Sequence, residues 1–347
     1  MTVVWVAMSG GVDSSVAAAR LVSEGHQVTG VTMRLLPEGD EPGTCCSTDA
    51  VRAARRVCDL LGIPHFTLNM HEVFQAEVIE CYVRDYAAGL TPNPCIVCND
   101  RVKFAALIAR ARVHGAEALA TGHYARIHPD DRGELWLRRA RDRTKDQSYF
   151  LYRLTVPAIR HVLFPLGGCT KDEVRTEARK LGLPTAERPE SQETCFVPAD
   201  AGSFVVSRAP RAGVPGPIVD TEGERVGTHR GIARYTIGQR KGLGVPGGPW
   251  YVREIRTDTG TIVVSRGTPS PVTTIELCDT LWRGAENQLV DAVVRYRALP
   301  VPARVFRTDT GVTVELERGV GGVAPGQAVV CYDHDRVVGG GVVRATR

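Results

Sequence analysis

The first chemically suggestive stretch of the chain is a turn of small and hydroxyl-bearing residues, SGGVDSS, at residues 9–15. Two adjacent glycines, Gly10 and Gly11, allow the backbone to turn sharply and to approach a ligand closely. The N–H groups at the start of the helix that we expect next attract an anion, and the serine hydroxyls add donors. Asp13 would repel a bare phosphate, so we expect it either to cap the helix or to hold Mg²⁺. The stretch predicts a phosphate site, and a plain strand–turn–helix connection is the alternative.

Cysteines are the second group of candidates for chemistry. The segment GLTPNPCIVCNDRVKF (89–104) contains a CxxC pair, Cys95 and Cys98, and SQETCF (191–196) contains Cys195. A zinc ribbon needs a second pair of cysteines or histidines at short spacing, and none is close in sequence. Because the CxxC lies in a Pro- and Asn-rich segment, we expect a substrate loop and not the helix start of a thioredoxin-like motif. A single Cys such as Cys195 is commonly just a packed residue, so its spacing leaves its role open.

The remaining cysteines have no chemical neighbourhood in the sequence. Cys58 falls on the apolar face of an expected helix, which predicts a packing role. Adjacent Cys45 and Cys46 are expected to lie in a structural loop leading into a helix, and a second thiol site is the alternative. We assign packing roles to the others, Cys81, Cys169, Cys278 and Cys331.

Alternating apolar segments of the first half predict the elements that would position these residues. Residues 3–8 are β-branched and apolar, which predicts a buried strand, and further strands are predicted at 28–33, 65–70 and 117–122. Helical spacing of apolar residues predicts helices at 13–25, 48–62, 72–87, 102–113 and 172–184. Repeated strand–helix units indicate a doubly wound parallel sheet of the α/β class, which binds its ligand at the carboxyl ends of the strands.

The pattern changes near residue 205. Residues 207–217 are rich in Pro, Gly and Arg, and short strand patterns separated by turn residues follow. We therefore expect a small β domain and then a β-barrel after the α/β domain. The predicted boundaries are 1–205, 206–270 and 271–347.

Composition restricts the classes of function. The chain has 347 residues, 43% of them hydrophobic, and contains no apolar run of about 18 residues that would predict a membrane span. Its start has no basic region or cleavage site of a signal peptide. We expect a cytoplasmic protein without a membrane partner, in which cysteines are usually reduced, catalytic or metal-binding.

Basic residues are unevenly distributed, although the formal net charge is only +4. Residues 126–180 contain 13 Lys and Arg against 8 Asp and Glu, and residues 225–241 contain five basic residues and no acidic one. Basic stretches with interleaved Tyr and His suit phosphate and base contacts. In a chain that also carries a predicted phosphate site, they favour a nucleic-acid partner over a merely solvated surface.

The motifs together resemble a known family. SGGVDSS is similar to the SGGxDS loop of the PP-loop ATP pyrophosphatases (adenine nucleotide α-hydrolase-like fold), and the common P-loop, GxxxxGK[ST], is absent. Nearly the whole chain resembles the bacterial tRNA-specific 2-thiouridylases, a family with a PP-loop domain, a small β domain and a C-terminal β-barrel. The matching motifs are AMSGGVDSS (7–15), TPNPCIVCN (91–99), KF (103–104), TGHYAR (121–126), KDQSYFL (145–151), SQETCF (191–196), YTIGQRKGLG (235–244), PWYV (249–252), VRYR (294–297) and PGQ (325–327).

The resemblance implies ATP-dependent 2-thiolation of the wobble uridine, position 34, of tRNA. The uracil O2 would attack the α-phosphate of Mg²⁺-bound ATP and release pyrophosphate, because AMP leaves C2 more readily than an unactivated oxygen does. The implied ATP-binding residues are Ala7, Met8, Ser9, Gly10, Gly11, Val12, Asp13, Ser14, Met33 and Gly122.

The same resemblance assigns roles to the cysteines. Cys195 would carry the incoming sulfur as a persulfide, and Cys98 would release it by forming a transient Cys98–Cys195 disulfide. One departure is Cys95, because many family members have Asp there, a plausible general acid or base. Either proton transfer is handled differently, or Cys95, Cys98 and Cys195 hold a [4Fe–4S] cluster. We favour the persulfide route.

The implied partners are the tRNAs for Lys, Glu and Gln and a persulfide donor such as a cysteine desulfurase or a relay protein. Asn93, Pro94 and Cys95 would lie against the target base. Other contacts to tRNA are expected from His123, Lys145, Asp146, Gln147, Arg295, Tyr296 and Gln327. The alternatives are another PP-loop enzyme, such as a GMP or NAD synthetase, and a non-catalytic RNA-binding protein.

Overall fold

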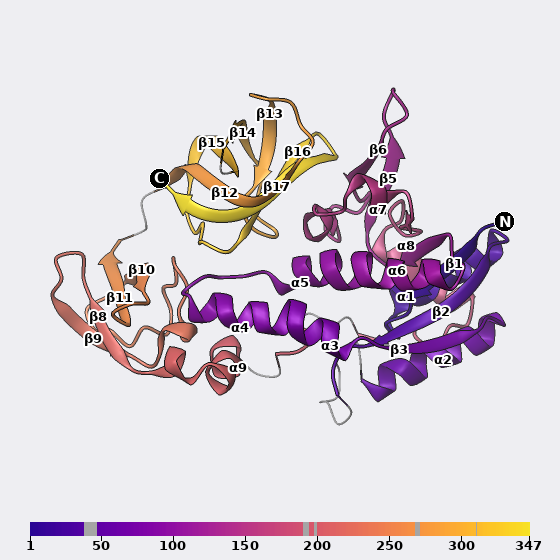
Figure 1. Cartoon of the computed structure of the whole chain (residues 1–347), viewed down its shortest axis with the longest axis horizontal. Coiled ribbons are helices and arrows are strands. Elements are labelled where there is room, and N and C mark those ends of the chain that lie inside the picture. Colours follow the sequence, from indigo (N-terminus) through magenta and orange to yellow (C-terminus); the bar gives the residue numbers. More distant parts are fainter. Residues whose placement is uncertain (38–46, 190–193, 198–199, 268–270, 310) are drawn as a thin grey trace. The chain divides into compact units, whose positions relative to one another are not determined.

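The computed structural model of the chain describes residues 1–37, 47–189, 194–197, 200–267, 271–309 and 311–347 (Figure 1). Cys45 and Cys46, and the first three residues of SQETCF, lie outside these ranges. The chain forms two compact units. The first comprises Met1–Val78, Cys95–Phe196 and Asp335–Val337, and the second comprises Ile79–Pro94, Val197–His334 and Val338–Arg347.

The first unit is built on a parallel sheet with the order β3-β2-β1-β4-β7. Its strands are β1 (Val3–Ala7), β2 (Gln27–Arg34), β3 (His65–Asn69), β4 (Ala118–Thr121) and the short β7 (Val162–Leu163). Strands β2 and β3 extend the sheet on one side of β1, and β4 and β7 lie on its other side. This reversal between β1 and β4 is the point where open parallel sheets bind ligands.

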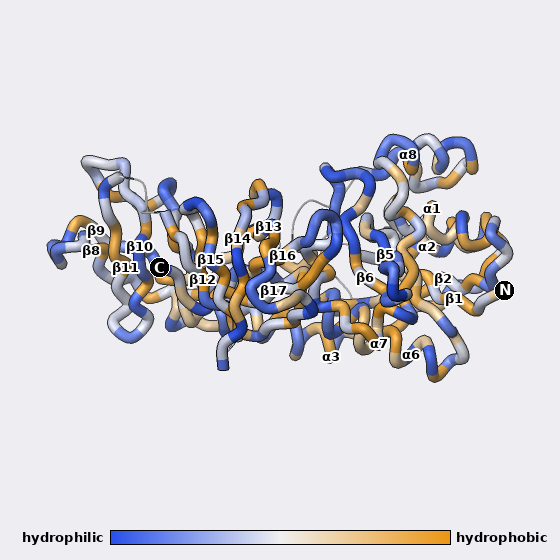
Figure 2. The backbone as a smooth tube through the Cα atoms, turned by 90° about the horizontal axis from the view of Figure 1, so that it is seen from above, coloured by the Kyte–Doolittle hydropathy of each residue, from blue (hydrophilic) through white to orange (hydrophobic). Residues whose placement is uncertain are grey.

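Helices α1 (Val12–Ser23) and α2 (Thr48–Leu61) pack on this sheet, and α8 (Lys171–Lys180) packs on α1. The core joins Val4 and Val6 of β1 to Val16 of α1, Val57 of α2 and Val174 of α8. Because the apolar residues of each helix recur at helical spacing, they share one face and are buried together. The remaining positions of α8 are mostly polar, as its blue trace in Figure 2 shows.

Two long helical runs contain π-helical segments. The first run consists of α3 (His71–Phe74), η1 (Gln75–Ile79) and α4 (Glu80–Ala87), and the second of α5 (Pro94–Val97), η2 (Cys98–Ala106) and α6 (Leu107–Val113). The prediction of a loop around the CxxC pair is therefore wrong, because Cys95 and Cys98 lie in helical segments. Pro94 begins the helix, a position where its missing N–H costs nothing. A π-helix is rare and is frequently found at functional sites.

The α/β unit also contains elements that the strand and helix patterns did not predict. An antiparallel hairpin of β5 (Ala125–Pro129) and β6 (Leu135–Arg139) follows β4. Two short helices follow it, η3 (Ser148–Leu151) and α7 (Val156–Ile159). Asp335 bonds to Arg126 at 2.9 Å and to Arg138 at 2.8 Å, so the hairpin is fixed by a residue distant in sequence.

After Phe196 the second unit continues with the short helices α9 (Ala201–Arg208), η4 (Pro210–Gly213) and η5 (Ile232–Arg234). It also contains a small sheet with the order β10-β11-β8-β9. The strands of this sheet are β8 (Gly216–Val219), β9 (Arg225–His229), β10 (Trp250–Arg256) and β11 (Thr261–Arg266). The β-rich character expected after residue 205 is confirmed, although α9 is helical.

The chain ends in a closed barrel. Its strands are β12 (Val272–Trp282), β13 (Leu289–Val293), β14 (Val301–Thr308), β15 (Gly311–Val320), β16 (Ala328–Asp333) and β17 (Arg336–Thr346). Their order is β12-β15-β14-β13-β16-β17, and β12 pairs with β17 to close the ring. Alternate residues such as Val301, Ala303 and Val305 are buried, as expected for strands that line a barrel interior. The predicted fold class is thus confirmed. Among the described residues, no helix is long and apolar enough to cross a membrane.

Candidate active site

The SGGVDSS turn connects β1 to α1 at the carboxyl edge of the sheet. Gly10 has φ +70°, a conformation that other residues rarely adopt. A Cβ on Gly10 would lie 2.3 Å from the carbonyl oxygen of Ala50 in the first turn of α2. Glycine is therefore required here both by the backbone angle and by the close approach of a second helix.

Hydroxyl groups brace the turn from within. The Ser9 backbone N–H donates to Ser14 Oγ at 3.2 Å, and the hydroxyls of Ser14 and Ser15 donate to the Gly11 carbonyl at 3.2 and 2.8 Å. Gly11 is the N-cap of α1 and makes no side-chain capping bond. The expectation that Asp13 caps the helix is wrong, because Asp13 lies inside the first turn and its carboxylate has other partners.

Those partners are two residues that the sequence patterns did not identify. The Lys171 ammonium lies 2.7 Å from each Asp13 carboxylate oxygen, and the Tyr124 hydroxyl donates to Asp13 Oδ1 at 2.8 Å. Lys171 is the first residue of α8, and its side chain is only 9% exposed, against 31% for Asp13. Tyr124 lies in the TGHYAR motif, and this motif was the only feature of the sequence that could have pointed to it as a site residue.

The other predicted ATP residues lie at the same edge of the sheet. Gly122 follows β4, and a Cβ there would lie 2.7 Å from the Ser14 backbone nitrogen. Met33 is near the end of β2, two positions beyond Val31, the register partner of Ala7. The structure thus places the loop, Gly122 and the end of β2 around the β1–β4 reversal.

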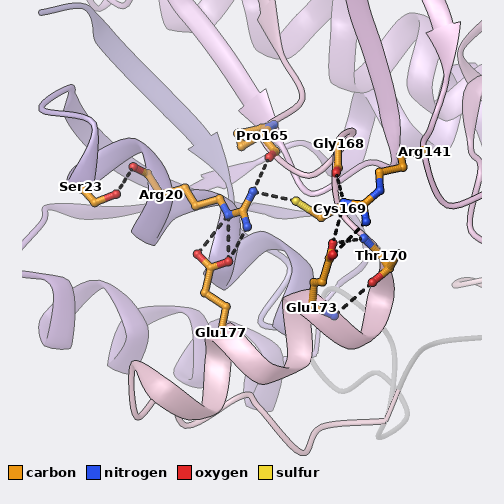
Figure 3. Close-up of polar contacts among 9 residues, drawn as sticks. All are labelled: Arg20, Ser23, Arg141, Pro165, Gly168, Cys169, Thr170, Glu173 and Glu177. Carbon is orange, nitrogen blue, oxygen red and sulfur yellow. Dashed lines mark hydrogen bonds and ion pairs between the residues drawn. The ribbon is translucent and has the colours of Figure 1, made fainter.

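Helix α8, which carries Lys171, is fixed by two polar clusters (Figure 3). In the first, Arg20 of α1 pairs with Glu177 and also donates to the Pro165 carbonyl at 3.2 Å and to Cys169 Sγ at 2.7 Å. In the second, Arg141 pairs with Glu173 at 3.0 Å and donates to the Gly168 carbonyl at 3.1 Å. Thr170 and Glu173 form a capping box at the start of the helix, which satisfies backbone N–H groups there.

The segment that leads to Cys195 is bonded to the SGGVDSS turn. The Thr185 hydroxyl donates to Ser15 Oγ at 2.9 Å, and the Arg188 guanidinium donates to the Gly10 carbonyl at 3.1 Å. Cys195 itself is partly exposed, in a turn, and the next residue, Phe196, is buried with its ring edge-on to Phe74 at 5.6 Å. The turn that presents Cys195 is anchored by this aromatic contact.

The CxxC pair differs in accessibility. Cys95 is exposed, whereas Cys98 is 8% exposed at the start of η2. The neighbouring helical residues are held by bonds from Asn99 to the Phe150 carbonyl at 3.2 Å and from Arg153 to Asp100 at 2.7 Å. Cys95, Cys98 and Cys195 are not joined to one another by a disulfide here. In the described part of the chain, no three His, Cys, Asp or Glu side chains form a group that could hold a metal, so this arrangement does not fit a cluster.

Two other cysteines are buried and unreactive in character. Burial raises the pKa of the Cys58 thiol to about 11 and that of Cys331 to about 12. Both remain protonated near neutral pH and are poor nucleophiles. Their packing roles agree with the sequence interpretation.

Two of the predicted tRNA residues of the first unit adjoin Tyr124: His123 precedes it in the chain, and Gln147 is bonded to it. His123 contacts Thr121 at 2.7 Å and packs against the rings of Phe104 and Phe164, and burial holds its pKa well below the usual value. The Gln147 amide oxygen accepts from the Tyr124 N–H at 2.9 Å. Asp146, in the same loop as Lys145, accepts bonds from the backbone N–H groups of Ala140 and Ser148. Asp146 and Gln147 therefore shape the loop that supports Tyr124.

The second unit brings a further set of predicted residues together. The Thr91 N–H donates to the Pro325 carbonyl at 2.8 Å, and a Cβ on Gly326 would lie 2.8 Å from the Thr91 nitrogen. The TPNP segment, with Asn93 and Pro94, thus adjoins the PGQ loop. Gln327 Oε1 is buried and has no hydrogen-bond partner among the residues that the structure describes. Arg295 and Tyr296 follow the end of β13, and the Arg295 guanidinium lies beside Gly322 of the same unit.

A doubly wound parallel sheet with a lysine-free SGGxDS turn at its strand-order reversal defines an ATP-binding protein of the PP-loop class. Residues 2–199 match the family described as tRNA methyl transferase HUP domain. Residues 202–266 match the tRNA methyl transferase PRC-barrel domain, and residues 272–343 match the aminomethyltransferase beta-barrel domain.

Relatives over the full length identify the family. The chain is 47% identical to a tRNA-specific 2-thiouridylase MnmA of Chloroflexus aurantiacus over 352 residues, covering 98% of each chain. It is 46% identical to the protein of that name from Carboxydothermus hydrogenoformans, covering 98% of this chain and 97% of the relative. It is 45% identical to that of Acidothermus cellulolyticus, covering 99% and 98%. The chain belongs to the MnmA family of tRNA-specific 2-thiouridylases, as its motifs predicted.

Proposed function

We propose that this protein catalyses ATP-dependent 2-thiolation of uridine 34 in tRNA, producing 2-thiouridine, AMP and pyrophosphate. The observation that carries the proposal is the SGGVDSS turn braced at the β1–β4 reversal, in the same unit as Cys98 and Cys195. An ATP site alone would fit many PP-loop enzymes. The thiol pair and the full-length relatives named 2-thiouridylases favour sulfur transfer.

The reaction divides into two parts. In the first, the uracil O2 attacks the α-phosphorus of ATP, pyrophosphate leaves, and C2 becomes bonded to an AMP leaving group. The N–H groups and hydroxyls at residues 9–15 bind the pyrophosphate end, where negative charge accumulates. Asp13 would hold Mg²⁺, which usually binds through one or two carboxylates together with substrate phosphates.

In the second part, sulfur replaces oxygen. The outer sulfur of a Cys195 persulfide attacks C2 and AMP departs, leaving a disulfide between Cys195 and the base. The Cys98 thiolate then attacks the Cys195 sulfur, which releases the thiolated base and forms the Cys98–Cys195 disulfide. A thiol reductant restores both cysteines before the next turnover.

The substrates are the tRNAs for Lys, Glu and Gln, and the sulfur comes from a persulfide donor such as a cysteine desulfurase or a relay protein. The residues assigned to tRNA are Asn93, Pro94, Cys95, His123, Lys145, Asp146, Gln147, Arg295, Tyr296 and Gln327. Support comes from the contacts that place several of them beside Tyr124 in the first unit and beside the PGQ loop in the second. The reaction takes place in the cytoplasm.

The family description of residues 2–199 names a methyl transferase. The test must therefore distinguish a thiolated from a methylated tRNA. We expect unmodified tRNA incubated with ATP, Mg²⁺ and a persulfide donor to acquire 2-thiouridine at position 34, with one pyrophosphate released per thiolated base. Nucleoside mass spectrometry and a pyrophosphate assay measure both. Pyrophosphate formed on another substrate without tRNA would indicate a different PP-loop enzyme. Binding of tRNA with no pyrophosphate would indicate a non-catalytic RNA-binding protein.

Binding of tRNA is expected to weaken steeply as salt rises. Arginine and lysine side chains within 126–180 and 225–241, together with Arg295, would neutralise phosphates and release counterions. We predict that affinity falls by about 100-fold or more between about 50 and 200 mM salt. Filter-binding titrations over this range measure the slope. A nearly constant affinity would show that these basic stretches are not the tRNA interface.

A further inference from the structure

We propose that Lys171 is a further substrate-binding residue of this enzyme, and that it contacts the β- and γ-phosphates of ATP. In the structure its ammonium pairs with Asp13. When Mg²⁺ and ATP bind, the metal ion would replace the ammonium at the Asp13 carboxylate, and Lys171 would move to the phosphates. This inference rests on the proposed function, because it names a residue that acts in the adenylylation step.

The first argument concerns charge at the turn. Residues 9–15 contain one carboxylate and no lysine or arginine. The common P-loop supplies a lysine within the loop itself, which reaches the β- and γ-phosphates. This turn binds the same highly charged group, so a cation must come from another element of the fold.

Lys171 is such a cation, and it is placed at the turn by an element distant in sequence. Its Nζ lies 2.7 Å from both Asp13 oxygens, and Asp13 precedes Ser14, whose hydroxyl accepts from the Ser9 N–H. Arg188 also reaches the turn, but its guanidinium donates to the backbone carbonyls of Gly10 and Asp49 and so braces the loop. Lys171 instead pairs with a side chain that can exchange it for another partner.

Burial makes this exchange favourable. The Lys171 side chain is 9% exposed, and a buried ammonium requires an anionic or hydrogen-bonding partner. Asp13 is that partner in the free protein. A Mg²⁺ ion bound by Asp13 repels the ammonium, and the ATP phosphates offer it a stronger anion at the same edge of the sheet. Tyr124, bonded to Asp13 Oδ1, keeps the carboxylate in position during the exchange.

Only the Lys171 side chain has to move. The first turn of α8 is held by the Thr170 capping box and by the Lys171 N–H, which donates to Asp142 Oδ2 at 3.0 Å. The Arg141–Glu173 pair also holds the first turn, and the Arg20–Glu177 pair holds the next one (Figure 3). The backbone is thus fixed, whereas the flexible four-carbon stem lets the ammonium change partners.

The test compares Lys171→Gln with Lys180→Gln, which removes the same charge from the exposed end of the same helix. Binding of α,β-methylene-ATP with Mg²⁺ and binding of adenosine are measured by calorimetry without tRNA. We expect Lys171→Gln to weaken binding of the ATP analogue by about tenfold or more, while the affinity for adenosine changes by less than about twofold. Pyrophosphate release with tRNA should fall by about 100-fold, and Lys180→Gln should match the wild type in every assay.

A second pair of variants covers the case in which Lys171→Gln does not fold because Asp13 has lost its cationic partner. Asp13→Asn is compared with Asp13→Asn/Lys171→Gln, in which both partners are neutral. We expect the double variant to lose still more affinity for the ATP analogue relative to adenosine than Asp13→Asn does. Equal losses for analogue and adenosine, or no added loss in the double variant, would overturn the role of Lys171. Failure of the wild type to release pyrophosphate with tRNA would instead count against the proposed function, since the binding comparison uses no tRNA.

Discussion

Replacing Cys98 or Cys195 by serine is expected to stop 2-thiouridine formation, whereas Cys95→Ser only slows it. On the proposed route Cys195 would carry the persulfide and Cys98 would attack it, so neither thiol can be replaced. Cys95 is exposed on α5 and would form neither of these sulfur bonds. Because adenylylation uses only ATP and the uracil oxygen, all three variants should still release pyrophosphate and adenylylate tRNA. Nucleoside analysis and a pyrophosphate assay under anaerobic conditions measure both parts.

The matched control is Cys278→Ser, since that thiol donates to the Val342 carbonyl and a serine hydroxyl can do the same. It should leave thiolation unchanged. If the three cysteines instead held a [4Fe–4S] cluster, each would be one of its ligands and all three variants would behave alike. A Cys95→Ser enzyme as inactive as Cys98→Ser, with brown colour and iron lost from both, would overturn the persulfide route.

The second large effect is expected for Asp13→Ala. The substitution should reduce pyrophosphate release by about 100- to 1,000-fold or more, because it removes the carboxylate that would hold Mg²⁺. Affinity for tRNA should stay within about threefold, since the proposed function assigns the turn to ATP, and the basic residues expected to bind RNA phosphates lie outside it. The variant also leaves the Lys171 ammonium without its carboxylate, which should lower the free energy of unfolding by about 1–3 kcal/mol.

Asp172→Ala is the matched control for Asp13→Ala. Each aspartate is the second residue of its helix, but Asp172 of α8 is exposed. Pyrophosphate release, tRNA binding and thermal unfolding are compared for both variants. A folded Asp13→Ala protein that loses tRNA affinity as strongly as pyrophosphate release would contradict the separation of the ATP and RNA sites.

Local periodicity was sufficient to predict the sheet and its helices. The expected strand at 28–33 is β2 (Gln27–Arg34), and the expected helix at 48–62 is α2 (Thr48–Leu61). Burial of one face imposes spacing on neighbouring residues, so a short window of sequence contains the information. The hairpin β5–β6 was not predicted, because its polar residues give little alternation and Asp335, almost 200 residues away, holds both strands.

By itself the sequence determined the turn, its glycines and the family, because motif spacing is a local property of the chain. Only the tertiary structure decided what the residues of the turn contact. Asp13 is paired with Lys171 and Tyr124 instead of capping α1, and the CxxC pair is helical instead of looped. Lys171 is 158 positions from Asp13 in the chain. No local pattern records such a pairing, because it follows from the packing of α8 on α1 and from the cost of burying an ammonium without an anion.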